Sequence, residues 1–146
     1  MEARTHSPRN VDALRELVMR EPSLIAGVYG DSAINASATI ETRHLKRMTA
    51  FDSTSGQLVA EAGVPIGDII AMLLPHGWFS MVTLGTKFVT LGGTIAADVH
   101  SKNHHKDGSF RACIDWIDLM GPDGEIRQCS RQDDAILFNH TSGGMG

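Results

Sequence analysis

Apolar residues recur at helical spacing in three parts of the chain. The first helix is predicted between Asn10, a residue type that caps helix N-termini, and Pro22, which ends it. The second starts near Pro65 and ends at 75–77, and the third covers 133–139. The apolar residues expected to pack inward are Val11, Leu14, Leu17 and Val18, then Ile66, Ile69, Ile70, Leu73 and Leu74, and finally Ile136, Leu137 and Phe138.

Shorter apolar stretches predict strands at 24–26, 48–52, 58–62, 112–120 and 125–130. The last two are joined by Gly121-Pro122-Asp123-Gly124, a strong turn signal, and the first of that pair is apolar enough to be a central strand. A short helical turn over 95–99, with exposed N–H groups at its start, is expected after the glycine pair at 92–93.

Size and charge narrow the classes of protein that are possible. A chain of 146 residues suits one domain, and a net charge of −4 argues against a nucleic-acid binder. The basic cluster at 43–47 is expected to be solvated. No apolar stretch approaches the ~20 residues of a membrane span, and the N-terminus lacks the apolar core of a signal peptide. We therefore expect a cytoplasmic protein without a transmembrane segment or a nucleic-acid partner.

The two cysteines, Cys113 and Cys129, are too few for a disulfide framework. A hairpin that turns at 122–123 places Cys113 opposite a residue near 132 rather than opposite Cys129. Two buried, unreactive thiols in a reducing compartment are the expectation.

The segment from Gly85 to His105 combines three glycines, three threonines and three histidines. Glycines let a backbone approach a ligand closely, and N–H groups and threonine hydroxyls bind phosphate oxygens. The segment matches neither the Walker loop nor the GxGxxG fingerprint, and a loop with glycines at sharp bends is the alternative. The residues that would cradle a phosphate are Gly85, Thr86, Thr90, Gly92 and Gly93.

The histidines at 100, 104 and 105 raise the question of a metal site. His100 and His104 would share a helix face, but Ser101 stands where HExxH has its glutamate, and no Cys-x-x-Cys is present. Contacts with a cofactor or substrate are therefore expected in place of a metal ligand set, and a small metal-dependent hydrolase is a distant alternative. A second glycine-bearing turn, 27–31, follows the strand at 24–26 and is a weaker candidate.

Together these segments resemble the FAD-binding (PCMH-type) domain of the vanillyl-alcohol oxidase/p-cresol methylhydroxylase superfamily. The resemblance lies in the block from Gly85 to Phe110, in Tyr29-Gly30-Asp31-Ser32, in 123–126 and in 143–146. It implies an α+β fold of two α/β subdomains that clasp FAD. Residues 1–146 would then be a C-terminally incomplete FAD-binding domain without its substrate domain.

The resemblance also implies residue roles. The diphosphate is expected at 27–31 and 85–93, and the isoalloxazine near His100, Asn103 and 108–110. Tyr29, His100 and Lys102 would lie at the reactive end of the flavin. The full set of expected cofactor contacts is Gly27, Tyr29, Gly30, Asp31, Gly85, Thr86, Val89, Thr90, Gly92, Gly93, Ala96, His100, Ser101, Asn103, Gly108, Ser109 and Phe110.

The implied activity is oxidation of a CH–OH group, with a sugar hydroxyl converted to a ketone. Some relatives attach flavin through a histidine of the first loop, and none occurs between Ser7 and Arg43, so non-covalent FAD is expected. Ser101 and Arg111 replace glycines of the family pattern, which would crowd the flavin. A degenerate fragment with weak or no flavin binding, or half of a split enzyme completed by a separate substrate-domain polypeptide, is the alternative.

Overall fold

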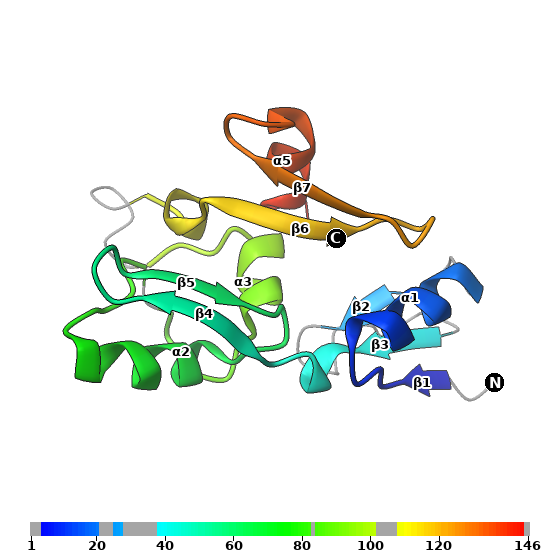
Figure 1. The fold of residues 1–146 in the computed structure, drawn as a ribbon, viewed down its shortest axis with the longest axis horizontal. Coiled ribbons are helices and arrows are strands. Elements are labelled where there is room, and N and C mark those ends of the chain that lie inside the picture. The colour runs from blue at the N-terminus through cyan, green and yellow to red at the C-terminus, as the bar shows by residue number, and fades with distance from the viewer. Residues whose placement is uncertain (1–3, 21–24, 28–37, 83, 102–107, 145–146) are drawn as a thin grey trace.

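The computed structural model describes residues 4–20, 25–27, 38–82, 84–101 and 108–144, and shows an α+β arrangement (Figure 1). An N-terminal unit contains β1 (Arg4–His6), α1 (Val11–Arg20), β2 (Ile25–Gly27) and β3 (Ala38–Glu41). The three strands form a parallel sheet in the order β1-β3-β2. The side-chain oxygen of Asn10 accepts the N–H of Ala13 at 2.8 Å, which confirms the predicted start of the first helix.

A central unit follows the short helix η1 (Thr42–His44). It contains the antiparallel pair β4 (Met48–Asp52) and β5 (Gln57–Ala60), then α2 (Ile66–Leu73), η2 (Leu74–His76) and α3 (Leu91–Ala96). Its core forms where the buried apolar side chains of α2 pack against the segment that leads to α3. The core residues are Val64, Ile66, Ile69, Leu73, Val82, Val89 and Phe110.

A third unit, drawn from yellow to red, lies above the N-terminal and central units in Figure 1. It contains η3 (Phe110–Cys113), the antiparallel hairpin β6 (Trp116–Met120) and β7 (Ile126–Ser130), and α5 (Ala135–Thr141). Phe138 of α5 and Cys129 of β7 are fully buried, so packing against the hairpin anchors the helix. Within the described part of the chain, no helix has the length and apolar composition that crossing a membrane requires.

Several expectations from the pattern of residues were wrong in detail. Ile136, expected to pack inward, is 75% exposed, and Leu74 is 55% exposed because it lies beyond α2 in the tighter turn η2. Residues 110–113 form η3, so the strand begins at Trp116, and among the described strands it pairs with β7 alone instead of lying centrally. Strands β1 and β3 were not predicted.

The glycine-rich helix was also misplaced. It was expected over 95–99, after the glycine pair, but α3 begins at Leu91 and includes both glycines. Thr90 is its N-cap, since its hydroxyl oxygen accepts the N–H of Gly93 at 3.3 Å. This cap outweighs the low helix propensity of the glycines.

Candidate functional site

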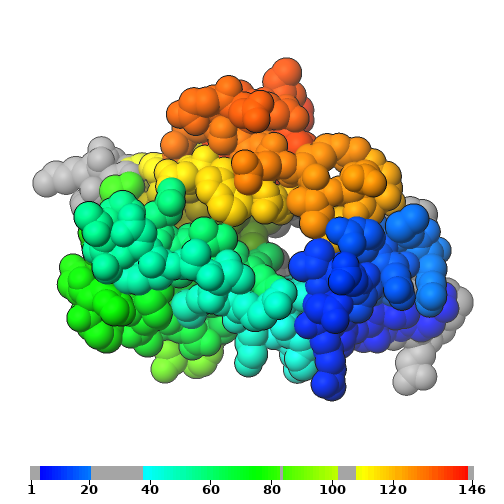
Figure 2. All heavy atoms as spheres, in the orientation of Figure 1, coloured from blue at the N-terminus to red at the C-terminus, as the bar shows by residue number. Residues whose placement is uncertain are grey.

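An opening lies between the N-terminal unit (blue), the start of the central unit (cyan) and the β6–β7 hairpin (yellow to orange) in Figure 2. The carboxyl edge of the parallel sheet faces the central unit. Because all three strands are parallel, His6, Gly27 and Glu41 end at the same edge, and the chain runs from Glu41 through η1 directly into β4. Ligands of open parallel sheets bind outside this edge.

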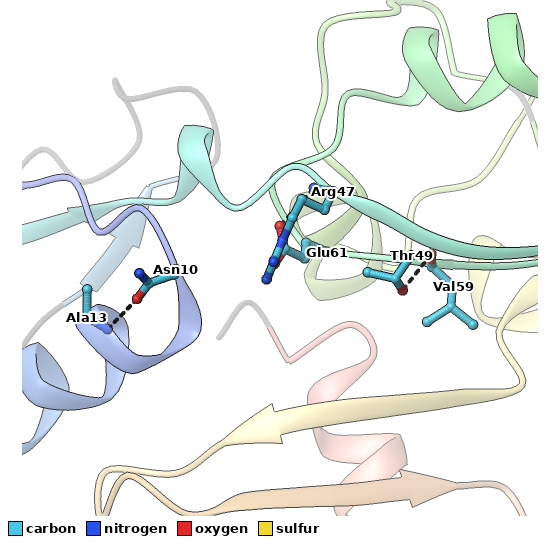
Figure 3. A network of polar contacts seen from close by, with 6 residues as sticks. All are labelled: Asn10, Ala13, Arg47, Thr49, Val59 and Glu61. Atoms are coloured by element: carbon cyan, nitrogen blue, oxygen red, sulfur yellow. Dashed lines mark hydrogen bonds and ion pairs between the residues drawn. The ribbon is translucent and has the colours of Figure 1, made fainter.

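The linker between the two units is fixed by Arg47 and Glu61 (Figure 3). The carboxylate of Glu61 accepts the backbone N–H of Arg47 at 2.8 Å and its Nε and Nη2 at 3.0 and 2.7 Å. In return, the N–H of Glu61 donates to the carbonyl of Arg47 at 2.9 Å. Burial by itself would raise the pKa of Glu61, but the hydrogen bonds and charge of Arg47 lower it below its ordinary value. Arg47, directly before β4, is therefore held against Glu61, directly after β5, at the base of the β4–β5 hairpin.

The segment before α3 lies antiparallel to the start of α2. Ile66 and Gly67 donate their N–H groups to the carbonyls of Val89 and Lys87 at 2.8 and 3.0 Å, and Pro65 bridges Thr90. This pairing places Thr86 through Gly93 along one edge of the central unit. Of the predicted cradle residues, Thr90 is held by this pairing, and Gly93 donates its N–H to the Thr90 hydroxyl.

The N–H groups at the start of α3 already have partners. Leu91 donates to the carbonyl of Val64 and Gly92 to that of Ala62, both at 2.8 Å, and Gly93 donates to Thr90. The expectation of exposed N–H groups at this helix start was therefore wrong. A phosphate cannot use the helix N-terminus here without displacing these bonds.

Other groups on the same edge fit an anion. Gly85 and Thr86 are exposed, and a Cβ placed on Gly85 would meet nothing within 4 Å, so the packing of the protein does not require glycine there. Thr86 and Thr90 each accept one N–H, from Phe88 and from Gly93 at 3.3 Å. A hydroxyl that accepts a hydrogen bond still has its own hydrogen to donate to a phosphate oxygen.

A second group of predicted residues lies on two bridged segments, 99–101 and 108–110, which together are called the hairpin arm. His100 pairs with Ser109 in an antiparallel bridge, and Phe110 donates its N–H to the carbonyl of Val99 at 2.8 Å. Gly108 has φ of 74°, a conformation that favours glycine. His100 is exposed, whereas Ser101 is half-buried.

Some predicted contacts belong to the core. Val89 and Phe110 are 8% and 5% exposed and pack among the side chains around α2, so only their backbones could touch a cofactor. Ala96 lies half-buried at the end of α3. Tyr29, Gly30, Asp31, Lys102 and Asn103 lie outside the described residues.

Two residues that the sequence reasoning had not assigned to the site lie at the base of the hairpin arm. The Oδ1 of Asp98 accepts the backbone N–H of Arg111 at 3.0 Å, and its Oδ2 lies 3.3 Å from Arg111 Nη2. Asp98 has φ of 41°, which asparagine, aspartate and glycine tolerate best. The helical turn predicted over 95–99 included Asp98, so no pattern in the sequence indicated this role.

Metal ligation has no structural counterpart in the described part of the chain. No group of three or more His, Cys, Asp or Glu side chains that could hold a metal ion occurs among those residues. Two of the three histidines considered for a metal site, His104 and His105, lie outside the described residues.

Comparisons with known proteins agree with this arrangement. The family model described as "FAD binding domain" matches residues 26–130. Decaprenylphosphoryl-beta-D-ribose oxidase of Mycolicibacterium smegmatis is 38% identical over 120 residues, which cover 81% of this chain and 26% of that protein. L-gulonolactone oxidase of Mus musculus is 25% identical over 142 residues, covering 91% of this chain and 32% of the relative. The chain thus spans about a quarter to a third of the length of these relatives.

Proposed function

Because this chain belongs to the FAD binding domain family, we propose that it holds FAD non-covalently in the opening between its N-terminal and central units. In this proposal it is the cofactor-binding part of an oxidoreductase that acts on CH–OH groups. Bound FAD would accept the hydride from the substrate carbon, while the protein supplies binding and orientation.

The observation that carries the proposal is the family match, which covers residues 26–130 and so includes both candidate loops. The carboxyl edge of the parallel sheet, which includes the end of β2 at Gly27, faces the central unit. The segment that contains Thr90 belongs to the central unit and pairs with the start of α2. In this proposal one dinucleotide would contact both loops, whereas a single phosphate would need only one.

Each described residue then has a limited role. The hydroxyls of Thr86 and Thr90 would donate to the diphosphate, and Gly85 would allow its backbone to approach. His100, exposed on the hairpin arm, would lie at the ring end and polarise a substrate hydroxyl. The roles expected for Tyr29 and Lys102 remain proposals from the resemblance.

The substrate class comes from the relatives. One is named for a ribose derivative and another for an aldonolactone. We propose that the complete enzyme oxidises a hydroxyl of a sugar or sugar-derived molecule to a ketone. Residues that select this molecule would come from outside the described part, including a substrate-binding domain or a separate polypeptide.

The test is a fluorescence titration of FAD with the purified chain, followed by release on denaturation. Quenching that saturates at one FAD per chain, with all flavin released by denaturant, supports a non-covalent site. Gly85→Val should weaken the affinity, because its branched side chain would occupy the space that the backbone edge leaves open. No quenching at micromolar protein, or flavin that stays with the denatured chain, would contradict the proposal.

One observation favours a second candidate, a domain that binds little flavin. The N–H groups at the start of α3 are already bonded to Val64, Ala62 and Thr90, so one usual source of phosphate affinity is lacking. The same titration separates the candidates, since this alternative predicts no saturable quenching.

A further inference from the structure

Asp98 and Arg111 enclose the hairpin arm that carries His100 and Ser109. Asp98 lies two residues before the bridged His100, and Arg111 lies two residues after Ser109, within η3. One carboxylate binds both the backbone N–H of Arg111, at 3.0 Å, and its guanidinium, at 3.3 Å. The two ends of the arm are therefore fastened to each other by a charged group and not only by the Phe110–Val99 bond.

Arg111 also reaches the end of α5. Its Nη2 donates to the carbonyl of Ser142, and its Nη1 lies 3.4 Å from the side-chain oxygen of Asn139. Next to these contacts, the N–H of Gly143 donates to the carbonyl of Ile95 in α3 at 3.1 Å. The pair thus joins the arm, the end of α3 and the end of α5.

Several features of this junction are unfavourable on their own. Asp98 has φ of 41°, and among the described residues the buried Nε of Arg111 and hydroxyl of Ser142 have no hydrogen-bond partner. Such costs persist where surrounding contacts fix one arrangement. Here the contacts that fix it are those of the Asp98–Arg111 pair.

We infer that Asp98 and Arg111 are a positioning pair that fixes the orientation of the His100–Ser109 arm, and with it the ring end of the FAD site. The inference rests on the proposed function for its cofactor part. It assigns no contact with FAD to either residue, since both act through the arm. Arg111 would then be a specific feature of this chain and not merely a residue that crowds the flavin.

The matched control is another arginine–aspartate pair. Arg127 and Asp123 at the tip of β6–β7 also form an ion pair, but their side chains are 51% and 46% exposed, against 34% and 20% for Arg111 and Asp98. Solvent weakens the exposed pair more. Arg127→Ala therefore removes the same kind of interaction at a distance from the arm.

The first measurement is amide hydrogen exchange in the chain without added FAD. Arg111→Ala should accelerate exchange at Phe110 and Gly143 by about tenfold, because charge-assisted hydrogen bonds that hold both segments are lost. Arg111→Lys should show a smaller acceleration, since an ammonium keeps the charge but lacks the planar fork that reaches Asp98 and Ser142 together. Arg127→Ala should leave both amides unchanged. Equal exchange in Arg111→Ala and the unaltered chain would overturn the inference.

The second measurement is the FAD titration, read together with the visible circular dichroism of bound flavin. Arg111→Ala should weaken affinity by about tenfold and alter the flavin bands, with partial recovery in Arg111→Lys. Unchanged affinity and bands would overturn the cofactor part. If the unaltered chain binds no FAD, the proposed function fails, and the exchange result still decides whether the pair fixes the arm. Should Arg111→Ala not fold, Arg111→Lys and Asp98→Asn provide both readouts.

Discussion

The Nε–H of Arg15 donates a hydrogen bond of 3.0 Å to the backbone carbonyl of Gly124, 109 residues further along the chain. This bond joins α1 of the N-terminal unit to the tip of the β6–β7 hairpin. Within the central unit, Arg47 at the end of the linker is bonded to Glu61. The bond from Arg15 therefore ties to α1 the tip of a hairpin that borders the opening in Figure 2.

The first prediction concerns the hairpin tip. Gly124 has φ of 76°, and a Cβ there would lie 2.9 Å from Arg15 Cγ and 3.0 Å from Met19 Cγ. Gly124→Ala should lower the free energy of unfolding by roughly 2–4 kcal/mol, from backbone strain plus overpacking. Urea denaturation measures the change.

Gly77→Ala is the matched control for this variant. Gly77 has φ of 77°, but a Cβ there would meet nothing within 4 Å, so only the strain applies. If Gly124→Ala and Gly77→Ala lower the free energy of unfolding by the same amount, the contact of the hairpin tip with α1 adds nothing to the cost of Gly124→Ala.

The second prediction separates packing glycines from ligand glycines. A Cβ on Gly92 would lie 2.8 Å from Ala62 Cβ, whereas a Cβ on Gly85 would meet nothing. Gly92→Ala should cost about 1–3 kcal/mol of stability, because α3 must move away from Ala62. Gly85→Ala should leave stability within about 0.5 kcal/mol. Thermal unfolding of both variants tests this, and a larger loss in Gly85→Ala would be contrary to the arrangement described.

The third prediction is a pH dependence. The folded-state pKa of Glu61 lies below its ordinary value, so the contribution of this group is present above the unfolded-state pKa and is lost as pH falls through the folded-state pKa. Glu61→Gln should be less stable than the unaltered chain at pH 7, and the difference should shrink below about pH 4. Urea midpoints at several pH values measure it. A difference that stays constant down to pH 3 would exclude the charge of Glu61 as its source.

The fourth prediction concerns thiol reactivity. Cys129 is fully buried, and burial, with the charges of Asp134 and Asp118, raises the pKa of its thiol. Cys113 is half-buried, and neither cysteine is in a disulfide. An aromatic disulfide reagent at pH 8 should modify Cys113 first, and both thiols only after denaturation. Simultaneous modification of both in the folded chain would show that α5 does not cover Cys129.

The sequence predicted the elements whose signals are local. Asn10 caps α1, and the Gly121–Gly124 turn places the β6–β7 register, in which Cys129 opposes Ile117 and not Cys113. The parallel strand β3 was missed because its partners β1 and β2 are distant in sequence. The start of α3 was misplaced because it depends on the Thr90 cap and on the pairing of Leu91 and Gly92 with Val64 and Ala62, which the glycine pair does not indicate.

The residues of the candidate site stay a prediction. The pairing of the Thr90 segment with the start of α2 is a tertiary feature that was not predicted. Whether helix N–H groups are free depends on tertiary pairing with Ala62 and Val64, which no local pattern reveals. Asp98 and Arg111 likewise meet only in the folded chain, and no repeating pattern in the sequence indicates that they pair.

The central claim is that one FAD contacts both units at once, and amide hydrogen exchange with and without saturating FAD tests it most directly. The account predicts slower exchange on FAD addition in two separate regions, at the carboxyl edge of the parallel sheet around Gly27 and Glu41 and along 85–93. Slower exchange in one region alone, or in neither, would contradict it.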